Sequence, residues 1–338
     1  MHPDRNLRID RVPATDRVPA TDRASATDHN RDRDPRLDRL RALASMQAGV
    51  FTRAQARKAG FSPAQIDTYV RRGQWLRVGY GVYAIAADSN PQHAHALVCA
   101  ASILGRSGDL VISHASAGVL FELPYVDVPK APTLTLARHG PPEHPTGLYV
   151  AQVPPEHRLT SFGLPLTTGP RTVADLLRTA ADELDAQALA DGALRSGVSR
   201  AEVEKVFGFC AGWPGIALAR AAWEFGEPLC ESPLESRCRI WFRDGGLPVP
   251  TPQFVFRTAP HRVLARVDFF FETQRVVVEA DGEVKYDNRK VIFKEKRRED
   301  TLRDLGLEVV RATWDDHRDG GADLVRRVRR AFERAARR

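Results

Sequence analysis

Three acidic residues, Asp268, Glu279 and Asp281, have the types and the spacing to bind a divalent metal ion. In the segment VDFFFETQRVVVEADGEVK, Asp268 belongs to one apolar strand and the other two acids end the next strand. Carboxylates at the rim of a β-hairpin repel one another unless a hard cation neutralises them, and Mg²⁺ accepts carboxylates together with waters and a phosphate. We therefore predict a Mg²⁺ (or Mn²⁺) site that hydrolyses phosphodiester bonds.

Two further residues are candidates for the same chemistry. Glu235, in the helical segment ESPLESRCRIWFRDGG, adds a carboxylate that would assist the metal ligands. Lys285, in the loop DGEVKY, would stabilise charge in the transition state if the loop folds back. A domain in which Lys285 cannot reach the site would bind nucleic acid without cutting it.

Each acid also has a structural interpretation. Glu235 stands three residues after Ser232, the spacing of a capping box that closes a helix start. Asp268, in an apolar strand, would need a partner such as Arg266 or Arg311, because an unpaired buried charge is costly. The acids that follow the valines would simply end a strand before an Asp-Gly turn.

Positive charge is concentrated near the end of the chain. Residues 289–338 contain 16 Lys and Arg against 10 Asp and Glu, within a net charge of +7. A basic surface beside carboxylates suits a phosphate polymer, because Lys and Arg release condensed counterions when they contact it. A solvated helix face is the alternative. The residues expected to contact DNA here are Lys294, Lys296, Arg297, Arg298 and Arg311.

Length and composition limit the class of protein. A chain of 338 residues exceeds what one core usually holds, so two or three domains are expected. The four cysteines form no C-x-x-C pair, which argues against a zinc cluster and a disulfide framework. There is no apolar run of the roughly 20 residues that a membrane span needs, and the first residues lack a secretory signal. We expect a cytoplasmic protein without a membrane segment.

The pattern along the chain predicts a multidomain α+β protein. Residues 1–35 contain the tandem repeat RVPATD RVPATD RASATD, which has almost no large apolar residues and predicts a disordered tail. Residues 36–88 are expected to form a winged helix-turn-helix, residues 89–228 a mainly helical middle domain, and residues 229–338 an α/β domain. In the middle domain the predicted helices include 91–104 and 107–121.

The helix-turn-helix prediction depends on two helix starts. Thr52 caps the segment RAQARKAG, and Ser62 followed by Pro63 opens PAQIDTYVRRG. The next segment, QWLRVGYGVYAI, suits a β-hairpin. Ile66 and Val70 would face the core, and the residues expected to reach DNA are Gln65, Thr68, Tyr69, Arg71, Arg72 and Arg77. A small helical module that packs on a neighbour and never contacts DNA is the alternative.

Polar residues of the middle domain favour structural roles. His93, His95 and His114 have Ala and Leu neighbours on predicted helices, which is more typical of core or surface histidines than of metal ligands. Arg171 is spaced to pair with Asp175 one helical turn later, although the same helix start would also suit an anion.

Two segments resemble known families. The segment GVFTRAQARKAGFSPAQIDTYVRRGQWLRVGYGVYAI resembles the N-terminal winged-helix domain of AbiEi-type antitoxins of type IV toxin–antitoxin systems. That resemblance implies DNA binding, autoregulation and a cognate toxin as partner. Further along, the helix with Glu235 and the strands ARVDFFF, VVVEADG and VVRATW resemble the PD-(D/E)xK restriction-endonuclease-like fold near the very-short-patch-repair endonucleases.

The second resemblance implies that Asp268 and Glu279 are metal ligands and that Glu235 is an outer carboxylate. The chain departs from the pattern at Asp281, which replaces the lysine two positions after the second acid, and a lysine follows only at Lys285. This departure leaves the enzyme question open. The first interpretation is a DNA-binding, Mg²⁺-dependent endonuclease in a defence or toxin–antitoxin setting. One alternative is an antitoxin-like transcriptional regulator with a degenerate nuclease domain, and another is an adaptor that binds protein. For the DNA-binding interpretations the expected partners are DNA, a cognate toxin or a second copy of the chain.

Overall fold

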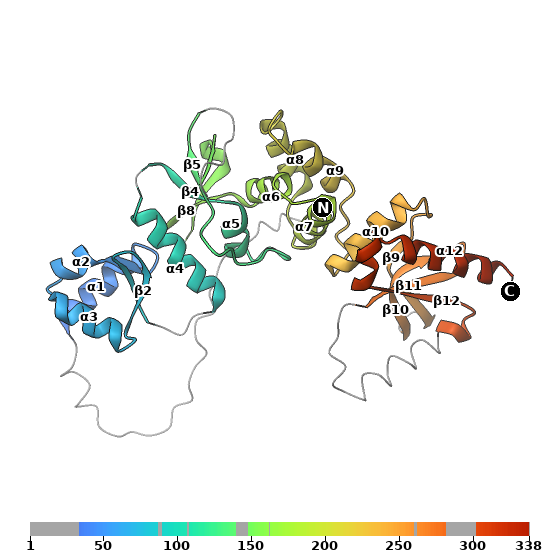
Figure 1. The fold of residues 1–338 in the computed structure, drawn as a ribbon, viewed down its shortest axis with the longest axis horizontal. Helices are drawn as coiled ribbons and strands as arrows, with labels where there is room; N and C mark the ends of the chain where they lie inside the picture. Colours follow the sequence, from blue (N-terminus) through green and yellow to red (C-terminus); the bar gives the residue numbers. More distant parts are fainter. Residues whose placement is uncertain are drawn as a thin grey trace, which may run out of the picture. The chain divides into compact units, whose positions relative to one another are not determined.

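Helices and β-sheets alternate along the chain in a computed structural model that describes residues 34–86, 90–106, 108–139, 148–161, 163–259, 262–281 and 302–337. The chain divides into two units, and Figure 1 traces the helices and strands in chain order, from blue to red. The first unit is residues 1–176 with 201–214, and the second is residues 177–200 with 215–338. Within the described ranges, no helix is long and apolar enough to cross a membrane. The predicted tail of residues 1–35 lies almost entirely outside those ranges.

The first elements form three helices and a small sheet. In chain order they are α1 (Pro35–Ser45), β1 (Val50–Thr52), α2 (Arg53–Lys58), α3 (Pro63–Arg71), β2 (Trp75–Gly79) and β3 (Val82–Ile85). The strands pair antiparallel in the order β1-β3-β2. Thr52 and Ser62 cap α2 and α3 through capping boxes, so both predicted helix starts are confirmed. Strand β1 was not predicted.

The rest of the first unit is built on a five-stranded sheet with the order β6-β5-β4-β8-β7. Its strands are β4 (Leu110–Ile112), β5 (Leu134–Ala137), β6 (Tyr149–Ala151), β7 (Arg158–Ser161) and β8 (Leu164–Thr167). Its helices are α4 (Pro91–Leu104), α5 (His114–Leu120), the 3₁₀ helix η1 (Pro155–His157), α6 (Gly169–Arg178) and α8 (Arg200–Phe209), the last two carrying boundaries between the units. The predicted helix over residues 107–121 is wrong in its first half, where β4 pairs with β5 and β8.

The histidines and the arginine of this region have the predicted structural roles. Buried His95 lies 2.9 Å from the Ser116 hydroxyl through Nε2, and burial lowers the pKa of this imidazole. His114 is buried and stacks on Tyr149 with ring centroids 3.5 Å apart. The Arg171–Asp175 pair, at 2.8 Å, is buried on both sides, which confirms the predicted ion pair.

The second unit contains a four-stranded sheet and the helices that cover it. Its elements are α7 (Glu183–Arg195), α9 (Ile216–Glu224), α10 (Pro233–Asp244), β9 (Thr251–Ala259), β10 (Arg262–Phe271), β11 (Val276–Asp281), β12 (Glu308–Thr313), the 3₁₀ helix η2 (Trp314–Asp319) and α12 (Ala322–Ala336). The sheet order is β12-β11-β10-β9, in which β12 runs parallel to β11 and the other pairs are antiparallel. The described part of this order agrees with the predicted helix–meander–strand succession.

One face of this sheet packs on α10 and α12. Phe269 and Phe271 belong to the core cluster on that face, whereas Val277 belongs to a second cluster on the opposite face. Gly321 lets α12 approach α10 closely, because its φ is +78° and a Cβ there would lie 2.2 Å from Trp241 Cγ. Any side chain at this position would push the two helices apart.

Candidate functional site

Asp268 lies where the pairing of β10 with β11 ends. The two strands pair as far as Phe269, which lies opposite Val278. Beyond that point Asp268 Oδ2 accepts a hydrogen bond from the backbone N–H of Ala280 at 2.8 Å, and Oδ1 accepts one from Gln253 Nε2 at 3.3 Å. The carboxylate therefore bridges two strands in place of a backbone ladder bond.

The two arginines considered as partners for Asp268 pair with other acids. Arg266 donates to both carboxylate oxygens of Glu231 at 2.8 Å, and this bond raises the pKa of the Arg266 guanidinium. Arg311 forms an ion pair with Asp281 at 3.6 Å. Asp268 is instead held by two neutral donors, the side-chain amide of Gln253 and the backbone N–H of Ala280.

Glu235 is buried and closes the start of α10. Oε1 accepts a hydrogen bond from the Ser232 hydroxyl at 2.8 Å, and Oε2 accepts from the Glu231 N–H at 3.0 Å and from Gln253 Nε2 at 2.8 Å. Burial raises the pKa of the Glu235 carboxyl, and the nearby charge of Asp268 raises it further. The predicted capping box is half formed: Ser232 caps the helix by accepting from the Glu235 N–H, but the Glu235 carboxylate bonds the N–H of Glu231 and not that of Ser232.

Gln253 links these two acids and was missed from the sequence. Its Nε2 donates to both Glu235 and Asp268, from the position in β9 that directly follows Pro252. Its backbone φ is +50°, which is uncommon for a residue other than glycine. A glutamine after a proline-rich link matches no motif, so only the register of β9 against β10 reveals it.

Glu279 and Asp281 share the face of β11 that points away from α10. Val276 and Val278 face the cluster beneath α10 and α12, and successive strand residues point to opposite faces. Arg311 lies next to Glu279 in the parallel register of β11 and β12. The structure therefore groups these two acids with Arg311, whereas Glu235 approaches Asp268 from the helix-covered face.

A metal site is not assembled by the described residues alone. Among them, no group of three or more His, Cys, Asp and Glu side chains is arranged to hold a metal ion. Five predicted residues lie outside the described ranges, namely Lys285, Lys294, Lys296, Arg297 and Arg298. The Mg²⁺ (or Mn²⁺) site and the catalytic roles assigned to its residues remain predictions.

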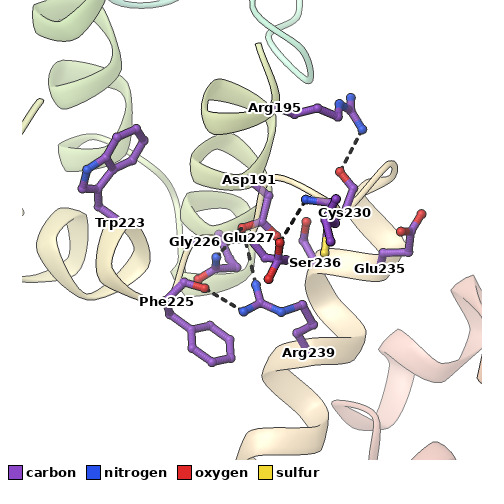
Figure 2. A network of polar contacts seen from close by, with 12 residues as sticks. Asp191, Arg195, Trp223, Phe225, Gly226, Glu227, Cys230, Glu235, Ser236 and Arg239 are labelled. Atoms are coloured by element: carbon purple, nitrogen blue, oxygen red, sulfur yellow. Dashed lines mark hydrogen bonds and ion pairs between the residues drawn. The ribbon is translucent and has the colours of Figure 1, made fainter. Parts of the chain in front are cut away.

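A buried polar network fixes the position of α10 (Figure 2). Asp191 of α7 is fully buried, and its Oδ1 accepts from the Glu227 N–H and from Gln187 Nε2, both at 2.7 Å. Arg239 of α10 lies 3.5 Å from the same oxygen and donates to the Phe225 carbonyl at 2.8 Å. Burial raises the pKa of the Asp191 carboxyl despite these donors. The network ties α10 to α7 and to the chain after α9.

The α3 helix presents a mixed outer face. Ile66 is fully buried beneath it, as predicted, while Arg71 and Arg72 are exposed near its end. Gln65 is exposed, but its Oε1 accepts from the Ser62 N–H at 2.9 Å and so serves the helix cap. Thr68 is half-buried and donates to the Ala64 carbonyl at 2.8 Å.

Tyr69 differs from its expected outward orientation. Its ring is half-buried and stacks on Trp75 with centroids 4.8 Å apart. It also meets Phe61 edge-on at 5.6 Å. Aromatic rings attract one another in such geometries, so Tyr69 belongs to the core of this small domain rather than to its outer face.

The β2–β3 hairpin carries an exposed aromatic residue that the sequence analysis passed over. Tyr80 is fully exposed at the turn, between Gly79 and Gly81. Arg77 on β2 is exposed as well, as predicted. The G-Y-G triplet at the hairpin tip could have predicted this exposure, because a large aromatic side chain in a turn has no core to pack against.

Comparisons with known proteins give a family match for the N-terminal elements and longer alignments with three Mycobacterium tuberculosis proteins. Residues 38–86 match the family described as "Transcriptional regulator, AbiEi antitoxin", a range that spans α1 to β3. Two Mycobacterium tuberculosis proteins, "Uncharacterized protein MT2308" (strain CDC 1551 / Oshkosh) and "Uncharacterized protein Rv2248" (strain ATCC 25618 / H37Rv), are each 29% identical over 273 residues, which is 80% of this chain and 97% of theirs. The crystal structure of RV2827C protein from Mycobacterium tuberculosis aligns with 61% of this chain and 80% of its own, at 15% identity and a TM-score of 0.35. The family match confirms the predicted resemblance of the N-terminal segment to AbiEi-type antitoxins.

Proposed function

We propose that this protein is a DNA-binding transcriptional regulator of the antitoxin type. The observation that carries the proposal is the family match over residues 38–86, because it covers the three helices and the hairpin as one block. The element order of this block and its β1-β3-β2 sheet support a winged helix-turn-helix. In such a domain α3 would enter the major groove.

Side-chain exposure supports DNA contact by α3 and the hairpin. Arg71 and Arg72 are exposed at the end of α3, and Arg77 and Tyr80 are exposed on the hairpin. Exposed arginines on α3 and on the hairpin would contact phosphates or base edges. Tyr69 is not among the proposed DNA contacts, because its ring packs on Trp75.

The test is binding of the full-length protein to a duplex that covers the region upstream of its own gene. Replacing Arg71 and Arg72 by Ala should weaken binding by about tenfold or more, because two charged contacts are lost. The matched control replaces Arg39 and Arg41 of α1 by Ala. Both arginines are exposed, so this double variant loses the same amount of charge. Equal binding by both double variants would refute the assignment of α3.

A cognate toxin is the second partner that the proposal implies. The family description names an antitoxin, so the partner would be encoded close to this gene. Co-expression followed by affinity purification of the tagged full-length protein tests this. Failure of the neighbouring gene product to co-purify, and of this protein to restore growth when that product is toxic, would contradict the antitoxin role.

Hydrolysis of phosphodiester bonds by the second unit is the other candidate function. It is favoured by one observation, that the pairing of β10 and β11 ends beside Asp268 and next to Glu279. Plasmid DNA with Mg²⁺ or Mn²⁺ should be nicked by the unmodified protein and by neither Asp268→Asn nor Glu279→Gln. No nicking by the unmodified protein would leave the second unit as a non-cleaving domain of the regulator.

A further inference from the structure

An arginine-lined groove follows the edge of the second sheet. It has a volume of about 350 Å³ and is lined by Val309, Val310, Arg311, Arg327, Arg330 and Arg334. Strand β12 is the last strand of the described sheet on this side, and α12 supplies three of the four arginines. The concentration of guanidinium groups in one groove calls for an anionic occupant.

The α12 arginines form a stripe because of their spacing. Arg327, Arg330 and Arg334 follow one another at steps of three and four residues, which places them on one side of the helix. The apolar residues of α12, such as Leu324 and Val328, are buried. At a rise of about 1.5 Å per residue, the stripe is about 10 Å long.

The arginines of the groove differ in how they are held. Arg327 donates to Asp316, to Asp323 and to the Arg311 carbonyl, so its guanidinium is fully used in fixing α12 to β12 and η2. Arg334 donates to Glu308 through Nε alone, at 2.9 Å, which orients the guanidinium while leaving its outer nitrogens without another bond to a described residue.

Arg330 is exposed and forms no ion pair with any residue that the structure describes. Together with the outer nitrogens of Arg334 it provides donors for a ligand. Arg327 is therefore a positioning residue, and Arg330 and Arg334 are the contact residues.

We propose that this groove binds the sugar-phosphate backbone of nucleic acid, as a contact surface additional to α3. The inference rests on the proposed DNA-binding function and extends it to the second unit. Guanidinium groups suit phosphate because they donate two parallel hydrogen bonds and keep their charge at every physiological pH. A stripe of about 10 Å is long enough for the guanidinium groups of Arg330 and Arg334 to contact phosphates of one strand.

The backbone of β12 argues against a peptide as occupant. A peptide that added a strand to this edge would need the outward carbonyls of β12 as acceptors. Arg327 already occupies the carbonyl of Arg311. A phosphate chain needs only the guanidinium donors. At its β12 side the groove reaches Arg311, which pairs with Asp281, so a bound strand would run towards the carboxylate edge of β11.

The test measures how salt affects binding of the full-length protein to a random-sequence duplex, by fluorescence anisotropy. Arg330→Ala with Arg334→Ala should lower the slope of log K against log salt by about 2 and weaken binding by roughly tenfold at low salt. The control, Arg326→Ala with Arg337→Ala, removes one exposed arginine of α12 and the exposed arginine at its C-cap, neither of which lines the groove. A slope equal to that of the control would overturn the proposal.

Two additional measurements separate this proposal from the proposed function. Arg330→Glu alone leaves the Arg334–Glu308 pair intact, so its loss of binding would not reflect misfolding. If Arg71→Ala with Arg72→Ala weakens binding while Arg330→Glu matches the unmodified protein, the groove proposal fails and the α3 assignment stands. If the unmodified protein binds no duplex, both fail. Binding of poly-glutamate in place of DNA, lost in Arg330→Glu, would also overturn the nucleic-acid assignment.

Discussion

The carboxylate of Asp268 and the backbone N–H of Ala280 are joined by a hydrogen bond of 2.8 Å between β10 and β11. Because the regular pairing stops at Phe269 and Val278, this bond holds the two strands together where their ladder ends. An acid predicted as a metal ligand thus also has a structural role, and mutation of Asp268 must distinguish the two.

Replacement of Asp268 by Ala should lower the free energy of unfolding by about 1–3 kcal/mol, because the Ala280 N–H loses its acceptor. Asp268→Asn keeps an acceptor oxygen and should cost about 1 kcal/mol or less. Urea unfolding of both variants measures this difference. Equal losses would mean that the hydrogen bond to Ala280 contributes nothing.

The stability contributed by Glu235 should depend on pH. Burial raises the pKa of this carboxyl in the folded state, so the folded protein binds a proton more tightly than the unfolded chain. The contribution is therefore complete below the pKa of the unfolded chain, about 4.3, and is lost as pH rises through the higher folded pKa. Relative to Glu235→Gln, the unmodified protein should lose stability as the pH rises above about 4.

Denaturant unfolding at several pH values measures this effect, with the exposed acid Glu272 replaced by Gln as the matched control. A stability difference between the unmodified protein and Glu235→Gln that stays constant, or that grows with pH, would contradict the burial of a proton-binding carboxyl at the start of α10.

Asp191→Ala should destabilise the second unit strongly. It removes the acceptor of Gln187 and of the Glu227 N–H and leaves Arg239 without its buried partner. Breaking a buried ion pair from one side costs about 3–5 kcal/mol. Asp185→Ala on the same helix removes a more exposed ion pair with Arg237 and should cost about 1 kcal/mol or less. Thermal or urea unfolding that ranks the two equally would refute the importance of the network.

Tyr69 should matter for stability rather than for DNA. Tyr69→Ala removes the stacking on Trp75 and should lower the stability of the N-terminal domain by about 1–3 kcal/mol. Tyr69→Phe keeps the ring and should leave both folding and DNA binding unchanged. Loss of DNA affinity in Tyr69→Phe, measured with the same duplex, would contradict this prediction and show that the Tyr69 hydroxyl contacts DNA.

The four cysteines should be unreactive while the protein is folded. All four are free and buried. Burial raises the pKa of Cys99 to about 11 and raises that of Cys238 well above its ordinary value. Since the thiolate is the reactive form, a maleimide at about pH 8 should label none of them in the native protein and all of them in denaturant. Rapid labelling of the native protein would show that the hydrophobic core around at least one of these cysteines opens easily.

Local features were predictable from the sequence because they depend on neighbours along the chain. Thr52, Ser62 and Ser232 were expected to begin helices, and each is an N-cap in the structure. The N-cap bonds join residues three positions apart, so the residue types suffice to predict them.

Features that depend on distant partners were not predictable. Strand β4 is a short apolar run, which periodicity does not distinguish from a buried helix, and its pairing with β5 and β8 decides the outcome. The strand positions of Asp268 and Glu279 were predicted, but the bonds of Asp268 to Gln253 and Ala280 follow from strand register. The sequence does not distinguish Arg330 from other exposed helix residues, because the groove that it lines forms only where α12 packs beside β12.

The order in which the chain contributes to its two units has an evolutionary consequence. Residues 177–200 belong to the second unit, and residues 201–214 return to the first before the chain finally stays in the second. Asp191, whose network holds α10, is on the inserted segment. A single crossover anywhere between residues 191 and 239 would separate Asp191 from Arg239, so an exchange of the second unit that keeps this network has to begin before residue 191.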